Sequence, residues 1–314
     1  MATRKNVTVP FIFGLFAGFL LPSAGTAQIR LVEPEATFPE DFGAIQTVRE
    51  LSDGRVLVAD PLGKALYLVD MGAGTRTVVG REGQGPEEYL RRIQAMDLVY
   101  EPGTDYKYSD LGMILLGEIL ARVAGRPLDE FVRARVFEPL HMTDTLYRPG
   151  EDRLPRIAPT ELDAWRGRVV HGEVHDENAF ALGGIAPHAG LFSTAGDLAR
   201  FVQMLLNGGV LEHHRIVSRG TVELFIRRAG GVADSTRALG WDTKSPEHST
   251  AGSLFSPDSF GHTGFTGTSI WVQPERELFV ILLTNRVHPT RENQLIREAR
   301  PAVADAVVEA LVVP

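Results

Sequence analysis

Apolar residues follow two different periods along the chain, and the change lies near Gln94. Residues 44–69 contain short apolar runs separated by tight turns, which is typical of antiparallel strands. Further on, the apolar spacing becomes helical. The stretch Leu111–Ala124 carries apolar residues three and four positions apart and stops at Gly125. It predicts a helix that is apolar on most sides and therefore largely buried.

Later segments predict more helices and a sheet. The expected elements are a helix from Pro127 to about Val136, a helix entered through the capping box at Ser193–Asp197, a short helix at Thr221–Arg228, antiparallel strands at Ser269–Val272 and Leu278–Leu283, and a closing helix from Pro301 to Leu311. This order predicts an α/β (α+β) protein. Residues 97–314 should form an antiparallel sheet backed by helices, and residues 28–93 a small β-meander at the N-terminal side.

The first residues have the three zones of a secretory signal. Arg4 and Lys5 precede the apolar run Phe11–Leu21, and small residues follow up to Ala27. A membrane anchor is the alternative, but the run is shorter than the roughly 20 residues that span a bilayer. We expect cleavage after Ala27 and an exported chain, periplasmic or extracellular, with no membrane span after cleavage.

Composition narrows the possible partners and chemistry. The net charge of -8 leaves no excess of Lys and Arg to neutralise phosphates, which argues against a nucleic-acid partner. The chain has no cysteine, so disulfides, thiolate metal sites and cysteine nucleophiles are excluded.

His171 and His175 lie four residues apart beside Asp176 and Glu177, a spacing that could hold a metal on one face of a helix. Gly172 makes a helix doubtful there, and a third convergent ligand is not evident. We favour a structural or solvent-facing role for these histidines, and we expect no metal and no cofactor.

The N-terminal segment resembles part of a known repeat. Val48–Asp60 resembles a blade of an NHL-like six-bladed β-propeller, and Gly80–Tyr89 resembles the connector to the next blade. The resemblance covers about residues 29–90, within a blade-like segment expected at residues 28–93. Blades bury their faces against neighbouring blades, and a second copy is not visible in the sequence.

Residues 97–314 resemble the serine β-lactamase and penicillin-binding-protein superfamily in its esterase-like branch. The motifs that carry the resemblance occur in the family's order: Glu101–Thr104 leading to Tyr108-Ser109-Asp110, Pro139–Thr145, Ala189–Thr194 and Gly261–Gly264. The segment matches the C-terminal part of the family domain. The resemblance therefore implies an incomplete β-lactamase-like sheet.

The resemblance also implies roles for individual residues. Tyr108 takes the position of the proton relay, and Asp110 takes the place of an asparagine that touches substrate. His262, Thr263 and Gly264 match the Lys-Thr-Gly strand motif that binds substrate, and a histidine there could orient substrate or lend a proton near neutral pH. The implied ligand is a small molecule, peptide or ester that acylates a serine.

The chain departs from the family's pattern at the nucleophile. A Ser-x-x-Lys motif needs a serine three residues before a lysine, and none of the four lysines has one; they are Lys5, Lys64, Lys107 and Lys244. Ser109 has no lysine one helical turn on, and Ser193 is better explained by helix entry. We find no nucleophile, and the family's first helix, first strands and nucleophile helix are expected to be missing, replaced by unrelated sequence.

Three hypotheses remain open. The first is a β-lactamase-related serine hydrolase homologue that is inactive as it stands. The second is a non-catalytic exported module that binds cell-wall peptide or glycan in a cleft around Tyr108, Asp176 and His262. The third is a chimeric gene fragment without selected function, suggested by the change near Gln94.

Overall fold

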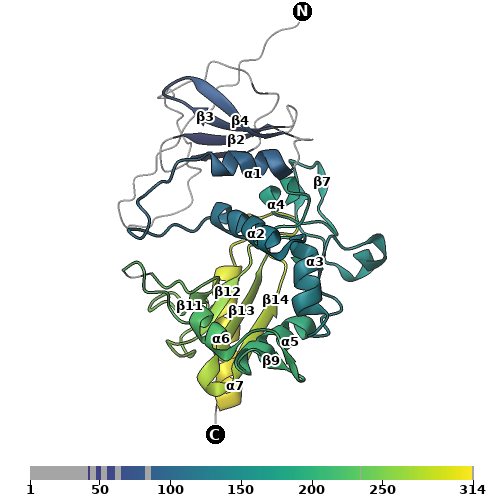
Figure 1. The fold of residues 1–314 in the computed structure, drawn as a ribbon, viewed down its shortest axis with the longest axis vertical. Helices are drawn as coiled ribbons and strands as arrows, with labels where there is room; N and C mark the ends of the chain where they lie inside the picture. The colour runs from purple at the N-terminus through teal and green to yellow at the C-terminus, as the bar shows by residue number, and fades with distance from the viewer. Residues whose placement is uncertain are drawn as a thin grey trace, which may run out of the picture. The chain divides into compact units, whose positions relative to one another are not determined.

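The computed structural model in Figure 1 describes most of the chain, namely residues 42, 47–50, 55–60, 65–81, 86–233 and 235–312. The expected signal at residues 1–27 lies outside the described residues. Contacts within the chain divide it into two compact units, residues 1–84 and 85–314.

The first unit contains the expected meander. Its four strands pair antiparallel in chain order: β1 (Thr47–Glu50), β2 (Val56–Asp60), β3 (Ala65–Asp70) and β4 (Thr75–Arg81). Val56 and Val58 of β2 are buried with Tyr67 and Val69 of β3, and Phe42 packs on this cluster. These residues share one face because side chains alternate along a strand.

Helix α1 (Pro86–Gln94) was not expected inside the blade-like segment 28–93. Its Tyr89 and Ile93 are one helical turn apart and are buried against Ile114. The interpretation of Gly80–Tyr89 as a propeller connector is therefore wrong from residue 86 onward. The boundary between the two units follows residue 84, earlier than the composition change near Gln94. Helix α1 belongs to the second unit because its apolar face packs against Ile114.

Helix α2 (Asp110–Ala124) confirms the predicted helix and its ends. Ser109 caps it by accepting from the backbone N–H of Leu111 at 3.2 Å, and Gly125 ends it with a left-handed φ of 65°. Its predicted burial is wrong, because Ile114 and Gly117 are the only buried residues of the helix. The exposed fractions of its outer apolar side chains reach 55% at Leu116, 56% at Ile119 and 83% at Val123.

The second unit is built on a sheet with helices on both faces. Strands β11 (Asp242–Thr243), β12 (Phe260–Thr263), β13 (Thr268–Gln273) and β14 (Leu278–Leu283) pair antiparallel in that order. Val272 is buried with Phe260 and Val202 of α5 (Ala195–Leu206), whereas the neighbouring Trp271 is buried with Ala304 and Val308 of α7 (Ile296–Val312). Adjacent residues of β13 thus face different helices (Figure 1). The α/β class is confirmed.

Shorter elements connect these parts. They are α3 (Leu128–Val132), which continues into the π-helical turn η1 (Arg133–Phe137), η2 (Glu151–Arg156), α4 (Glu177–Ala181), α6 (Arg219–Ile226), η3 (Pro274–Arg276), and the strand pairs β5 (Leu146–Tyr147) with β8 (Leu191–Phe192), β6 (Leu162–Asp163) with β7 (Arg168–Val169), and β9 (Val210–Leu211) with β10 (His214–Arg215). The closing helix begins at Ile296, so Pro301 lies inside it rather than at its start.

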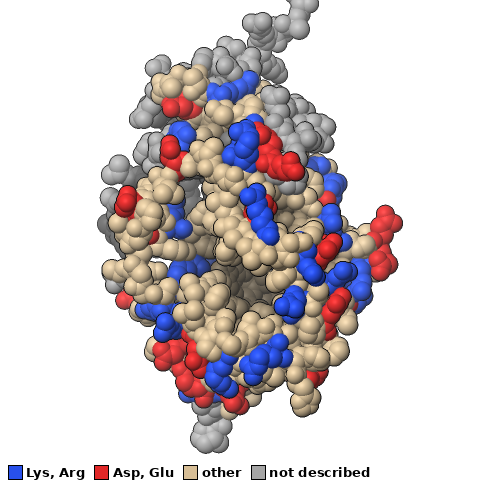
Figure 2. Space-filling model, in the orientation of Figure 1, with Lys and Arg blue, Asp and Glu red and all other residues tan. Residues whose placement is uncertain are grey.

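Charged side chains of both signs are interspersed on the face drawn in Figure 2, without a large basic patch. The same face is hollowed between α2 and the ends of β13 and β14 (Figures 1 and 2).

Two glycines of α2 provide a matched test of how closely this helix is packed. A Cβ at Gly117 would lie 2.6 Å from Cγ of Pro187, whereas a Cβ at Gly112 would have no atom within 4 Å. Both Gly→Ala changes gain about 0.5–1 kcal/mol of helix propensity. We expect Gly112→Ala to raise the free energy of unfolding and Gly117→Ala to lower it by about 1–3 kcal/mol through overpacking. Urea denaturation measures both, and equal effects would contradict the close packing.

Candidate functional site

Tyr108 lies two residues before the start of α2 and beside His262 of β12, one of the residues expected to bind substrate. Its ring centroid is 6.3 Å from that of His262 on β12, with an angle of 30° between the rings. Tyr106 stands two residues earlier in the same segment. The structure therefore brings together Tyr108 and His262, which are 154 positions apart in the sequence, as the motif order implied.

Arg237 joins these aromatic side chains and was missed by the sequence reasoning. Its guanidinium carbon lies 4.8 Å from the ring centroid of Tyr108 and 5.4 Å from that of Tyr106, within the range of cation–π attraction. Its Nη1 also forms an ion pair with Asp242 Oδ1 at 2.5 Å. No local spacing around Arg237 signals this role, because its aromatic contacts, Tyr106 and Tyr108, lie in a segment distant from it in the sequence.

The hydrogen bonds of His262 assign its tautomer. Nδ1 lies 2.9 Å from the carbonyl oxygen of Thr263 and must donate to it. Nε2 lies 3.4 Å from Arg237 Nη1. Since a guanidinium can only donate, Nε2 accepts this longer bond with its lone pair. These two contacts match the tautomer of His262 that carries its proton on Nδ1.

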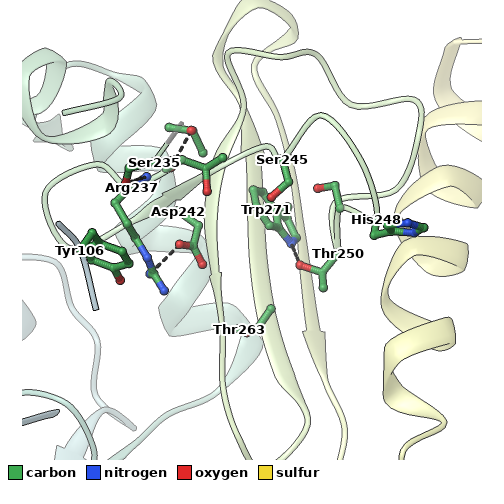
Figure 3. Close-up of a pocket in the computed structure, with 12 residues that line it drawn as sticks. Tyr106, Ser235, Arg237, Asp242, Ser245, His248, Thr250, Thr263 and Trp271 are labelled. Atoms are coloured by element: carbon green, nitrogen blue, oxygen red, sulfur yellow. Dashed lines mark hydrogen bonds and ion pairs between the residues drawn. The ribbon is translucent and has the colours of Figure 1, made fainter. Parts of the chain in front are cut away.

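A polar pocket of about 450 Å³ opens beside this group. Figure 3 shows Tyr106, Arg237 and Asp242 on one side of it and Thr250 and His248 on the other. Most of its lining residues carry hydroxyl groups: Ser235, Thr236, Thr243, Ser245, Ser249, Thr250 and Thr263.

Several of these hydroxyls are available to a ligand. Thr250 accepts a hydrogen bond from Trp271 Nε1 at 3.2 Å, and Thr243 donates to the carbonyl oxygen of Thr236. By contrast, the hydroxyls of Ser245 and Thr263 form no hydrogen bond within the described part of the chain. The pocket therefore has the size and donor–acceptor groups of a site for a small polar molecule.

Gly264 has a structural reason to be glycine. A Cβ there would lie 2.1 Å from Thr268 Oγ1, across the turn that joins β12 to β13. Its backbone N–H donates to the carbonyl oxygen of Thr268 at 2.8 Å, and its own carbonyl oxygen accepts from Arg300 on α7 at 2.6 Å. These contacts hold the turn that follows His262 and Thr263.

The electrostatics of Tyr108 favour its protonated form. Although 61% of the residue is exposed, partial burial, and then the negative charge of Asp110, raise the pKa of the phenol above its ordinary value of about 10, and the Arg237 guanidinium acts in the opposite direction. At neutral pH Tyr108 is consequently a hydrogen-bond donor and a poor proton acceptor.

Asp110 belongs to a second group of side chains. Its carboxylate, a carboxylate oxygen of Asp176 and a ring nitrogen of His188 all lie within 4.8 Å of one another. Asp176 is also the N-cap of α4, where Oδ1 accepts from the N–H of Ala179 at 2.8 Å. Asp176 thus lies with Asp110, and it does not line the pocket beside His262.

The paired histidines have structural contacts, as favoured from the sequence. Nε2 of His171 lies 2.9 Å from the carbonyl oxygen of Ile157. His175 is buried, and its Nε2 lies 2.8 Å from Glu161 Oε2. Glu161 is also buried and accepts from Nε of Arg291 at 2.7 Å.

A match to a family model shows the class of protein. A family model described as Beta-lactamase matches residues 46–305. The chain belongs to the β-lactamase family. This family contains serine hydrolases, and the chain is a homologue of them. Neither this match nor the similar structures described below support the resemblance of residues 28–93 to a propeller blade.

Two curated relatives illustrate the sequence similarity. A candidate D-alanyl-D-alanine carboxypeptidase of Escherichia coli (strain K12) is 37% identical over 224 residues, covering 65% of this chain and 50% of that protein. A protein of the same description from Salmonella typhi is 35% identical over 221 residues, covering 65% of this chain and 51% of its own length. The chain spans about half the length of these relatives.

Solved structures agree with the fold. A penicillin-binding-protein homologue from Caulobacter crescentus has a TM-score of 0.52 and 20% identity, covering 71% of this chain and 64% of its own. A mutant of simvastatin synthase from Aspergillus terreus has a TM-score of 0.53 and 16% identity, covering 74% of this chain and 62% of its own. At these identities the similarity shows the fold alone. In the described residues, no helix has the length and hydropathy needed to cross a membrane.

Because Glu161 is buried and paired, we expect the free energy of unfolding to depend on pH. Burial alone would raise its pKa, but the hydrogen bonds from Arg291 and His175 outweigh burial and lower it. The ionised carboxylate thus stabilises the folded state above the ordinary pKa of about 4.3, and this contribution is lost as the pH falls through the lowered folded-state value.

We expect Glu161→Gln to reduce the free energy of unfolding at pH 7 by about 2 kcal/mol, because Arg291 loses a charged partner. The difference from the wild type should shrink as the pH falls below the ordinary carboxyl pKa of about 4.3 and through the lowered folded-state pKa. Urea unfolding at a series of pH values measures this difference, with the exposed Glu247→Gln as control. A difference that is constant with pH would contradict the assignment.

Proposed function

We propose that the chain is an exported β-lactamase-family homologue of D-alanyl-D-alanine carboxypeptidases that does not form an acyl-enzyme as it stands. The observation that carries the proposal is the absence of any serine three residues before a lysine in the sequence. Acyl transfer in this family requires a serine with a base within hydrogen-bond reach.

The surroundings of two lysines in the described chain support the proposal. The residue three positions before Lys107 is Thr104, whose hydroxyl donates to the carbonyl oxygen of Glu101 at 2.6 Å in an irregular loop. Lys244 donates its Nζ to the carbonyl oxygens of Ser253 and Phe255.

The two serines nearest to the family motifs are also held in structural contacts. Ser109 Oγ accepts from the N–H of Leu111 as the cap of α2. Ser193 Oγ lies 2.7 Å from Thr145 Oγ1, which donates to the Asp197 carboxylate. A protonated Tyr108 adds no base, so the described groups support ligand binding better than turnover.

Covalent labelling tests the proposal directly. The purified chain is incubated with a fluorophosphonate probe and with a chromogenic β-lactam, and intact mass spectrometry records adducts. We expect less than about 5% acylation under conditions that label an active serine β-lactamase completely, since no activated serine is present. Stoichiometric acylation of any serine would overturn the proposal, and Tyr108→Phe would then show whether the phenol takes part.

A second candidate function is non-catalytic binding of a cell-wall peptide or glycan. The supporting observation is the pocket of about 450 Å³, with the Arg237 guanidinium at one side and, in its lining, the hydroxyls of Ser245 and Thr263, which have no hydrogen-bond partner among the described residues. The relatives named for D-alanyl-D-alanine hydrolysis suggest a peptide ligand in the periplasm.

Titration calorimetry with acetyl-Lys-D-Ala-D-Ala tests this function. We expect saturable binding and no release of D-Ala by chromatography, with weaker binding of the L-Ala-L-Ala peptide. Thr263→Val should weaken binding about fivefold, as the loss of one hydrogen bond of about 1 kcal/mol predicts. Thr290→Val, outside the pocket, is the matched control. Absence of saturable binding by this peptide and by a glycan fragment would exclude the binding function.

A further inference from the structure

The group formed by Asp110, Asp176 and His188 has a composition and geometry that the proposed function does not use. One oxygen of each carboxylate and one ring nitrogen of the histidine lie within 4.8 Å of one another. The three residues come from separate places: the first turn of α2, the N-cap of α4, and the segment before β8. The fold therefore brings three possible metal ligands to one point.

His188 has unused bonding capacity at a buried position. Its side chain is only 6% exposed, and Nε2 lies 3.0 Å from Asp176 Oδ1. Its Nδ1 is buried and finds no hydrogen-bond partner among the described residues. Buried ring nitrogens are normally paired, so an unpaired one requires an explanation. The nitrogen that faces Asp176 is Nε2, so Nε2 is the ring atom that would share a cation with the two carboxylates.

An ion pair between Asp176 and His188 also does not explain why Asp110 lies in this group. Its carboxylate forms no hydrogen bond or ion pair within the described chain. It nevertheless lies within 4.8 Å of the Asp176 carboxylate, where two negative charges repel. A bound cation would remove this repulsion.

The negative charges of both carboxylates affect the pKa of two tyrosines, Tyr89 and Tyr108. Burial is the largest cause that raises the pKa of Tyr89 and of Tyr108, and the charges of Asp110 and Asp176 raise each of them further. Tyr89 donates its hydroxyl to Asn178 Oδ1 at 2.6 Å, so it does not neutralise the carboxylates. The negative potential at this group therefore comes from Asp110 and Asp176 together.

We propose that Asp110, Asp176 and His188 bind one divalent transition-metal ion, and that the ion is Zn²⁺. An imidazole nitrogen with two carboxylate oxygens suits zinc, whereas Mg²⁺ and Ca²⁺ prefer ligands that are all oxygen. Zinc bonds of about 2.0–2.2 Å place tetrahedral ligand atoms roughly 3.3 Å apart. The ligand atoms lie within 4.8 Å of one another, so zinc binding requires the Asp110 side chain, which forms no hydrogen bond or ion pair within the described chain, to move toward the other two ligands, with water as the remaining ligand.

Calorimetric titration of the untagged full chain with ZnCl₂ at pH 7.5 tests the site. We expect one ion per chain, a higher melting temperature with zinc, and no comparable effect of MgCl₂. Asp110→Asn is isosteric and breaks no contact of the described fold, so it should remain folded and bind zinc at least about tenfold more weakly. His188→Gln should behave alike, and His213→Asn, an exposed histidine elsewhere, should bind as the wild type does.

X-ray absorption at the zinc edge of the titrated chain should show a first shell of mixed nitrogen and oxygen. Failure of the wild type to bind one zinc ion below about 100 μM would overturn the proposal. Unchanged affinity in either folded variant would also overturn it, because the ion would then be held elsewhere. Circular dichroism of each variant establishes that lost binding is not lost folding.

Discussion

The contact between Trp271 and Gly261 is the constraint on which the pocket depends. A Cβ at Gly261 would lie 2.6 Å from ring atoms of Trp271 and 2.2 Å from the carbonyl oxygen of Ile270. The indole therefore lies directly over a strand position that has no side chain. Its other side is buried with α7, and its Nε1 binds Thr250 at the rim of the pocket. The same residue thus fixes the strand pair that carries His262, one wall of the pocket, and the helix behind the sheet.

Local signals in the sequence were enough to predict most elements of the fold. Capping residues, glycine stops and alternating apolar residues act over a few positions, and α2, α5, β13 and β14 were predicted from them. The burial of α2 was predicted wrongly for a physical reason. An apolar period shows that a face can be buried, but what covers it depends on segments distant in the sequence.

The candidate site was predictable only in part. The family resemblance implied that Tyr108 and His262 meet, and the structure places them together. Arg237 and His188 gave no signal, because their contacts with His262 and Asp176 join residues 25 and 12 positions apart. Tyr108 and Asp110 enter different groups although they are two positions apart. The extended Ser109 between them, with φ −150° and ψ 128°, separates the loop from the first helical turn.

The packing of α1 determines where the second unit can be separated from the first. Tyr89 and Ile93 belong to the buried cluster around Ile114, although their sequence lies on the meander side of the composition change. A recombinant fragment that began at residue 97 would leave Ile114 and its partly buried neighbours without cover. A fragment that began at residue 85 would keep this cluster whole, so the choice of cloning boundary decides whether the isolated unit retains its core.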